Sequence, residues 1–581
     1  MIISDLKSIV RQKDRVSFVR STDKWHAMEY RTADFSGVLL TAEENTFPTS
    51  LNLKLDVTGY YNIWLGFIHL GVGNDNHITV RLGGDKVPSN LCPEQFNRFV
   101  VDGYNYWAPY QWMEEGFWKC ADLTGQDLII EKPDCITGGC TSTLAFIRLE
   151  KAEKNRDTAH LPKNMMFHCD TDHLFWYYRY KTPEEYASVI DLLSGGTGEI
   201  VVQETYFEDF EVLGTKGVEA KLCRVNYSEN YLKYLGRQDS VAENLVNHAH
   251  AAGMKIYAGN RLEMGNFMQP LDTPILSKKF VEEHPEFAIY TRDGRRTPIL
   301  SYAYKEVREW EINRLMKSVE RGYDGISVFF IRGVFIGFEK PVLDRFISWY
   351  GEGVDPRLLP IKEERLSKVM CSFITEFFEE LKDRLVNFEK AGGRKIGVNI
   401  VVNYDIGSNK FIGCDIEALL KKGLVDSVSQ GLMKTYEDLT DCMDGDLIDM
   451  EKYESELAKR AIVRRTFHDK AETVLSGAKE ILALTSKYNA DFYGALPWES
   501  KNVEYFVELA QKQYDSGVKK LIVWNANHIT ESLPKLNVVK NLGDFEKTIG
   551  LPLNNRELRS IFRVMSLDGK DISTVNTSWL G

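Results

Sequence analysis

HPEFAIYTRDGRRTPILSYAYKEVREWEINRLMKSVERGYDGISVFFIRG, residues 284–333, is the part of the sequence that decides the fold. Between about 305 and 320, Val307, Trp310 and Val319 recur at roughly helical spacing, which predicts an amphipathic helix. The run ISVFFI that follows is apolar on both faces, as in a strand of a buried parallel sheet. A helix followed by a buried strand is the repeating half-unit of an α/β fold.

The same alternation of strand and helix continues from about residue 164 onward. Helical stretches such as 240–253 and 363–388 separate the candidate strands. Eight β/α repeats predict a (β/α)8 TIM barrel with long loops. A doubly wound open sheet is the alternative, but no glycine-rich phosphate-binding motif follows the first strand. The eight predicted strands are 165–169, 199–205, 255–260, 325–331, 395–402, 425–430, 490–496 and 519–525.

Residues 1–158 have a different pattern, with short alternating runs that end in turns. We expect an N-terminal β-sandwich domain there, because no long amphipathic helix interrupts the strands. Its aromatic cluster at 104–112 either stacks on a sugar or packs against the next domain, so we interpret residues 1–158 as a carbohydrate-binding-like accessory domain. The barrel is predicted over 159–545, and residues 546–581 are predicted to form a C-terminal extension.

Composition excludes some classes of function. The net charge of −12 argues against a nucleic-acid partner, because a nucleic-acid backbone requires a basic surface. No apolar run is long enough for a signal peptide or a membrane span, so we expect no membrane association. The nine scattered cysteines lack zinc-binding spacing and are typical of a reduced, cytoplasmic protein. The sequence leaves the oligomeric state open, and a homo-oligomer is possible.

Three segments of the opening stretch resemble a known family. They are HPEF at 284–287, YKEVR at 304–308 and DGISVFFIRG at 324–333. They are similar to the H-P-E-W loop, the N-P-E-V-R helix start and the D-G-I-x-L-D-F-x-R-G strand of the family 10 glycosylhydrolase-like proteins of bacteria. In the N-terminal region, YNIWLG, ITVRLGGD, WKCADLTGQ and LAFIRL resemble the same family. The resemblance implies a barrel that cleaves sugars.

The sequence departs from that family at two positions. Phe329 stands where many relatives have an acidic residue inside the strand. Asn525 stands where relatives often have the aspartate of a W-D-T-N motif. We therefore expect strand 325–331 to contribute Arg332 to binding, and other strands to carry proton transfer.

The candidate site residues follow from one rule about barrels. In characterised TIM-barrel enzymes the site lies at the C-terminal ends of the strands. Acidic groups, amides and tryptophans gathered there favour a carbohydrate substrate, an oligosaccharide or glycoside. The predicted substrate-binding residues are Asp170, Asp172, His173, Asn260, Arg261, Glu263, Arg332, Asn403, Trp498, Trp524 and Asn525.

Glycoside hydrolysis usually needs two carboxyl groups, a proton donor and a base or nucleophile, about 5–5.5 Å apart for retention or about 6.5–9.5 Å for inversion. The leading predicted catalytic pair is Asp405 and Glu499, after the fifth and seventh strands. Glu204, after the second strand, is the third catalytic candidate, and Glu263 is a further reserve.

Other interpretations remain open at this point. The segment HCDTDH, residues 168–173, has metal-ligating residue types, but it equally suits a helix N-cap, and no second ligand motif accompanies it. We therefore predict neither a metal nor a cofactor. Besides a glycoside hydrolase, the sequence allows a carbohydrate-binding barrel that has lost hydrolysis, or a non-hydrolytic carbohydrate-active enzyme such as a lyase.

Overall fold

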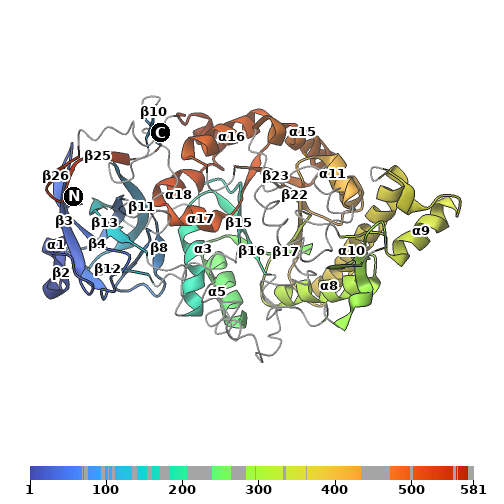
Figure 1. The fold of residues 1–581 in the computed structure, drawn as a ribbon, viewed down its shortest axis with the longest axis horizontal. Coiled ribbons are helices and arrows are strands. Elements are labelled where there is room, and N and C mark those ends of the chain that lie inside the picture. The colour runs from blue at the N-terminus through green and yellow to red at the C-terminus, as the bar shows by residue number, and fades with distance from the viewer. Residues whose placement is uncertain are drawn as a thin grey trace.

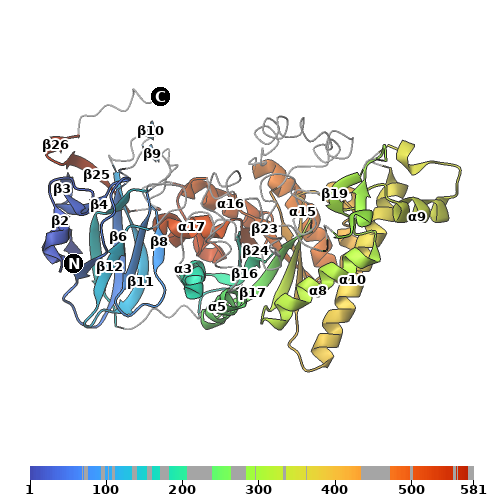
Figure 2. The ribbon, with the colours of Figure 1, turned by 60° about the horizontal axis from the view of Figure 1, so that its bottom comes forward.

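The structure is a computed structural model. A β-rich half and an α/β half lie side by side (Figures 1 and 2). Within the described chain, no helix has both the length and the hydropathy needed to cross a membrane. The described residues are 1–68, 70, 76–92, 99–101, 104–106, 112–133, 140–153, 160–170, 182–205, 238–262, 280, 283–294, 296–330, 335–360, 363–432, 471–497, 501–553, 558 and 560–572.

Eight parallel strands close into a barrel, which confirms the predicted barrel class. Every neighbouring pair is parallel, and the last strand pairs with the first. The continuous apolar runs of the sequence are strands because each is covered by helices outside and by barrel side chains inside. The strands are β15 (Met165–Cys169), β16 (Gly198–Glu204), β17 (Lys255–Arg261), β20 (Gly325–Phe329), β21 (Gly397–Val402), β22 (Ser427–Gln430), β23 (Asp491–Ala495) and β24 (Lys520–Val523).

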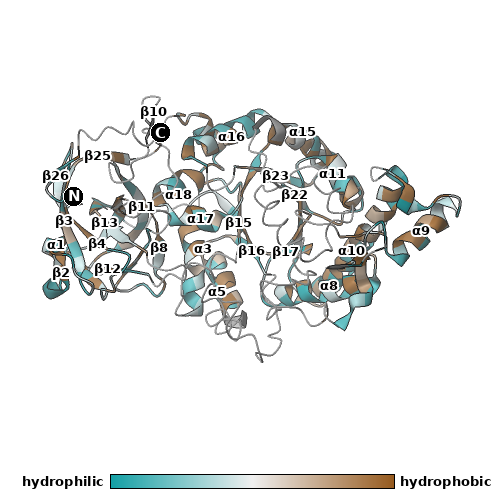
Figure 3. Cartoon of the chain, viewed as in Figure 1, coloured by the Kyte–Doolittle hydropathy of each residue, from teal (hydrophilic) through white to brown (hydrophobic). Residues whose placement is uncertain are grey.

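Amphipathic helices surround the barrel, and Figure 3 shows hydrophilic and hydrophobic residues mixed along them. In α10 (Glu364–Lys390), Leu366, Met370, Phe373 and Phe377 recur every three or four residues and are buried. Each such side chain contributes about 1.5–3 kcal/mol when fully buried. The other long helices of the barrel are α5 (Gln238–Ala251), α8 (Lys305–Glu320), α15 (Ala471–Lys487) and α16 (Val503–Asp515).

The lower and middle levels of the barrel interior are filled by side chains. The ring of Tyr257 on β17 lies against Gly325 and Gly397, where an added Cβ would come within 2.5 Å and 2.1 Å of the ring and its hydroxyl. Above it, Asn399 on β21 donates to Ser327 Oγ at 2.7 Å and accepts from Ser427 at 2.9 Å. The interior is therefore a packed core, and only its C-terminal mouth is available for chemistry.

Residues 1–151, together with two strands from the C-terminal part of the chain, form a β-rich half, the β domain, whose strands are largely antiparallel, in sheets of ten and four strands. Leu65 on β6 (Tyr60–Ile68) and Leu128 on β12 (Asp127–Glu131) are fully buried in one apolar cluster, so both sheets contribute to one core. The sandwich arrangement and the domain boundaries at 158 and 545 stay predictions. The remaining strands of the two sheets are β1 (Ile2–Ile3), β2 (Val16–Ser17), β3 (Trp25–Thr32), β4 (Ser36–Ala42), β5 (Leu51–Lys54), β7 (Ile78–Leu82), β8 (Ser89–Leu91), β11 (Trp112–Asp122), β13 (Ser142–Leu144), β14 (Phe146–Lys151), β25 (Ser560–Leu567) and β26 (Lys570–Asp571).

The C-terminal part of the chain returns to the β domain. Strand β25 lies between β11 and β3 in the ten-stranded sheet, so the two ends of the chain share one sheet. The barrel contacts this domain through α18 (Leu533–Val539). Asn537 on α18 accepts the backbone N–H of Phe117 at 2.7 Å and donates to its carbonyl at 2.9 Å. Gly116 lies so close to Leu533 that an added Cβ would come within 2.3 Å of it.

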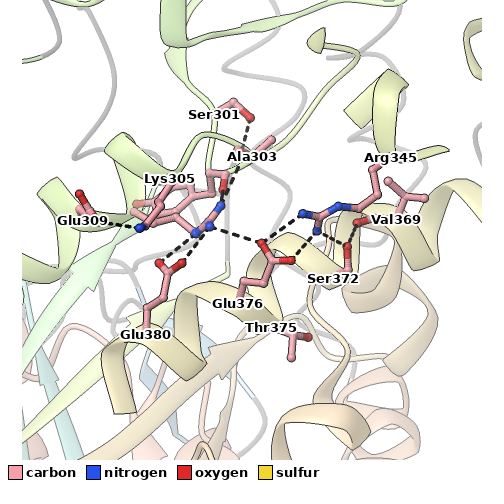
Figure 4. A network of polar contacts seen from close by, with 12 residues as sticks. Ser301, Ala303, Lys305, Glu309, Arg345, Val369, Ser372, Thr375, Glu376 and Glu380 are labelled. Atoms are coloured by element: carbon pink, nitrogen blue, oxygen red, sulfur yellow. Dashed lines mark hydrogen bonds and ion pairs between the residues drawn. The ribbon is translucent and has the colours of Figure 1, made fainter. Parts of the chain in front are cut away.

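Outside the barrel, ion pairs join α8 and α10 to α9 (Lys340–Tyr350), as Figure 4 shows. Arg308 on α8 donates to both carboxylate oxygens of Glu380 and lies 3.3 Å from Glu376. Arg345 on α9 is 2.7 Å from Glu376, which is thus shared by two arginines. These contacts fix the helices that follow strands β17 and β20.

Candidate active site

Four polar side chains meet at the mouth of the barrel. His168 on β15, Glu204 on β16 and Arg261 on β17 come from three adjacent strands, and Asp170 directly follows the first of them. All four residues are at least 95% buried. Their orientation follows from strand alternation, because inward-facing Met166 and Val202 lie two residues before His168 and Glu204.

Arg261 joins the two carboxylates. Its Nε lies 2.8 Å from Glu204 Oε1, and its Nη2 lies 2.7 Å from the same oxygen. The same Nη2 lies 3.1 Å from Asp170 Oδ2. One guanidinium therefore holds two buried carboxylates, an arrangement that a planar fork of donors suits better than a lysine would.

His168 is oriented by two hydrogen bonds. The backbone N–H of Asn525 donates to His168 Nδ1 at 3.4 Å, so Nδ1 is the acceptor nitrogen. The proton of the neutral ring is then on Nε2, which lies 2.7 Å from Glu204 Oε1 and donates to it. Trp524 and Phe329 pack against the imidazole with ring centroids 4.7 and 5.3 Å away.

The buried charges of this group are paired with one another. Burying a charge is costly unless it is paired, and Arg261 pairs with both acids here.

Asn527 adds a neutral group to the same mouth. It lies on α17 (Ala526–Glu531), is 3% exposed, and its Oδ1 accepts the backbone N–H of Asp170 at 3.0 Å. Among the described residues its Nδ2 has no hydrogen-bond partner. The sequence predicts no catalytic or binding role for His168 or Asn527, although both lie at the ends of predicted strands. Side-chain alternation along β15 could have identified His168, because it places His168 on the same inward face as Met166.

Asp405 has a different environment from the one expected of a catalytic acid. It is the N-cap of α11 (Ile406–Phe411), where Oδ1 accepts the Ser408 N–H at 2.8 Å and Oδ2 accepts the Ser408 hydroxyl at 2.6 Å. Both carboxylate oxygens are therefore engaged in capping a helix, the usual role of aspartate at that position. The Asp405 part of the predicted catalytic pair is not supported by these contacts.

Three predicted binding residues are also used in the scaffold. Asn260 points out of the barrel toward α8, where it donates to buried Glu311, because its neighbour Arg261 is the inward residue of β17. Asn403 donates to the carbonyl of Phe330 at 3.3 Å. Trp524 donates from Nε1 to the carbonyl of Gln430 at 3.2 Å, which leaves its ring against His168.

The remaining predictions concern metal binding, the cysteines, and site residues that lie outside the described ranges. Within the described ranges, no group of three or more His, Cys, Asp or Glu side chains has the arrangement of a metal site. Six cysteines of those ranges are free thiols, and burial raises the pKa of the Cys169 thiol beneath the mouth. The predicted residues outside the described ranges are Asp172, His173, Glu263, Arg332, Trp498 and Glu499.

No family model and no curated protein matches this sequence. Among solved structures, the chain is similar to the PgaB (BpsB) glycoside hydrolase domain of Bordetella bronchiseptica, with a TM-score of 0.39, 13% identity and coverage of 66% of this chain and 99% of that one. It is also similar to the catalytic domain of a β-amylase from Paenibacillus polymyxa, with a TM-score of 0.42, 10% identity and coverage of 67% and 99%.

A tryptophan synthase from M. tuberculosis matches as well, with a TM-score of 0.28, 11% identity and coverage of 67% of this chain and 94% of that one. The similarity therefore extends beyond glycoside hydrolases. At these scores and identities it carries no argument about the reaction, which has to come from the side chains at the mouth.

Proposed function

We propose that this protein is a glycoside hydrolase that cleaves an oligosaccharide or glycoside at the C-terminal mouth of the barrel. The observation that carries the proposal is the pair of buried carboxylates, Asp170 and Glu204, on adjacent strand ends and bridged by Arg261. The motif resemblance of residues 284–333 supports the same reaction class.

The two carboxylates lie close together at the mouth. Nη2 of Arg261 is 3.1 Å from one carboxylate oxygen and 2.7 Å from the other, so those two oxygens are no farther apart than the two distances together. Because Asp170 is not the proton donor in this proposal, its separation from Glu204 does not distinguish retention from inversion, which depends on the distance between Glu204 and the donor.

The roles follow from the contacts. Glu204 Oε1 accepts hydrogen bonds from Arg261 and His168, which fix its carboxylate at the mouth, so Glu204 is the nucleophile or base in this proposal. Asp170, which also accepts from Arg261, assists electrostatically. A proton donor must hold its proton near neutral pH, and an arginine partner opposes that. Glu499, predicted from the sequence alone, is therefore the proposed acid.

Hydrolysis of aryl glycosides by single variants tests the proposal. A panel of p-nitrophenyl glycosides identifies the sugar with the wild-type protein first. Glu204→Gln should then lower kcat by about 10³-fold or more, since the nucleophile is a covalent participant. Glu499→Gln should lower kcat mainly for substrates with poor leaving groups, because only those need the acid. Full activity in Glu204→Gln, with an unchanged melting temperature, would overturn the assignment.

One observation favours a second candidate, a carbohydrate-binding barrel without hydrolysis. Phe329 is fully buried and its ring lies 6.1 Å from Trp524, which closes the barrel centre where relatives of the resembled family have an acid. Tight binding of an oligosaccharide with no turnover by the wild-type protein would select this candidate. Turnover that depends on Glu204 would exclude it.

A further inference from the structure

A cavity of about 680 Å³ lies in the β domain, at the end of the ten-stranded sheet where β3 and β4 pair. Its apolar lining includes Met28 on β3, Leu70, and Leu567 on β25. Arg20, Glu43 and Asn45 contribute polar groups. The volume is within the ~300–1,000 Å³ typical of small-molecule sites.

The polar side of the cavity is held in place by the protein itself. Nζ of Lys132 donates to the backbone carbonyls of Glu43, Glu44 and Thr46 at 2.6, 2.7 and 2.7 Å. This single ammonium fixes the loop of residues 43–46 from behind. The backbone N–H of Phe47 donates to the carbonyl of Thr22 at 2.7 Å, which ties that loop to the opposite wall. A wall fixed in this way pays little ordering entropy on binding.

A buried histidine lies beside this wall. His26 pairs with Thr41, which lines the cavity, across the β3–β4 ladder, so the two side chains are on one face of the sheet. His26 is 5% exposed, and its Nδ1 makes no hydrogen bond among the described residues. That nitrogen lies 3.6 Å from Glu43 Oε1, beyond hydrogen-bond distance, and Arg20 is 2.9 Å from the same oxygen. Buried polar atoms without a partner are rare and call for an explanation.

We propose that this cavity binds one sugar ring of a glycan, separately from the barrel mouth. A pyranose has apolar C–H faces and a rim of hydroxyls that each donate and accept. The aliphatic floor of Met28, Leu70 and Leu567 suits the former. The carboxylate of Glu43, the amide of Asn45 and the guanidinium of Arg20 suit the latter, since they supply acceptors and donors together.

The same lining disfavours anionic ligands. A phosphate or other anion would meet Glu43 and Glu44 beside the single arginine, which is already paired with Glu43. A neutral, polyhydroxylated ligand adds no like charge beside these carboxylates and can donate its hydroxyls to them.

Ligand-observed NMR on the full chain tests the proposal with methyl glycosides of glucose, galactose and N-acetylglucosamine at millimolar concentration. We expect at least one glycoside to bind, and Arg20→Met and Glu43→Gln each to weaken that binding about tenfold, or 1.4 kcal/mol. Glu29→Gln, an exposed carboxylate of β3 that lies on the opposite face from Met28, is the matched control and should bind as the wild type does.

Melting temperatures of the variants guard against misfolding, and the exposed side chain of Arg20 makes its replacement a mild one. The proposal is overturned if none of the glycosides binds, or if the bound glycoside is held equally well by both cavity variants. The result is separable from the barrel reaction, because a protein that binds here and hydrolyses nothing would keep this inference while refuting the proposed hydrolase.

Discussion

Arg261 contacts one oxygen of Glu204 through two of its nitrogens, Nε at 2.8 Å and Nη2 at 2.7 Å. The two residues come from adjacent strands, β17 and β16, at the ends where a barrel enzyme places its chemistry. A carboxylate held by two donors of one rigid guanidinium has little freedom to rotate. Preorganisation of this kind is what a site needs when charge develops on a bound substrate.

Replacing Arg261 should therefore destabilise the protein strongly. Arg261→Met leaves Glu204 and Asp170 buried without their shared cation, and breaking a buried ion pair in this way costs about 3–5 kcal/mol. Denaturant unfolding monitored by tryptophan fluorescence measures the loss. Arg357→Met is the control, since Arg357 pairs with Asp355 at the surface, and its effect on stability should be much smaller because exposed ion pairs contribute little. Equal effects of the two variants would contradict this reading of Arg261.

Asp405 offers a direct comparison between a structural and a catalytic role. If it only caps α11, Asp405→Ala should cost about 0.5–2 kcal/mol of stability, and Asp405→Ser should recover most of that. Turnover at saturating substrate should be unchanged in both. Asp415→Ala, which removes the N-cap of α12 (Ile416–Lys421), is the matched control and should show a similar loss of stability. A large fall in kcat for Asp405→Ala alone would support the catalytic role predicted from the sequence.

The strands and the convergence of their ends could be predicted from the sequence, but the role of Asp405 could not. The eight barrel strands are predictable because a strand buried on both faces has to be a continuous apolar run. The meeting of Asp170, Glu204 and Arg261 is predictable because strand ends converge in a barrel, while their roles stay predictions. The role of Asp405 is ambiguous in sequence, since an acid at a strand end also suits the N-cap of the next helix.

Orientation within a strand is the other part that the sequence leaves open. Asn260 and Arg261 are adjacent at the end of β17, and only one of them can face the barrel axis. The run KIYAGNR does not decide which, because both faces of this strand are apolar or small. Packing decides it, since Tyr257 fills the barrel against Gly325 and Gly397, which sets Arg261 inward and Asn260 toward Glu311.

Glu339 makes the outer helices sensitive to pH. It is completely buried, and it accepts hydrogen bonds from the Ser301 hydroxyl and from the backbone N–H groups of Gly337 and Tyr290. Burial raises its pKa to about 6 from 4.5, against the opposing effect of those hydrogen bonds. The folded state thus binds the proton more tightly than the unfolded state, and stability should fall by about 2 kcal/mol as pH rises from 4.5 through 6.

Unfolding free energies between pH 4 and pH 7.5 measure this contribution. Glu339→Gln should remove that part of the pH dependence, although the amide also loses one acceptor oxygen. Glu309→Gln on α8, an exposed residue paired with Lys305, should keep the wild-type profile. A Glu339→Gln protein with an unaltered pH profile would show that another group titrates in this window.

The contact between the β domain and the barrel is expected to be intolerant of one added methyl group. An alanine Cβ at Gly116 would lie 2.3 Å from Leu533 Cβ and 2.8 Å from the backbone of the same residue, so α18 would have to move away from β11. Overpacking of this kind costs about 1–3 kcal/mol. Because Asn537 bonds the neighbouring Phe117 backbone through both amide atoms, the shift should also strain those hydrogen bonds.

Differential scanning calorimetry of Gly116→Ala should show a transition that begins at a lower temperature and is broader than that of the wild type. Gly353→Ala has nothing within 4 Å of the new Cβ and serves as the control. Coincident thermograms for Gly116→Ala and the wild type would mean that the contact between β11 and α18 does not contribute to stability, and that α18 does not couple the β domain to the barrel.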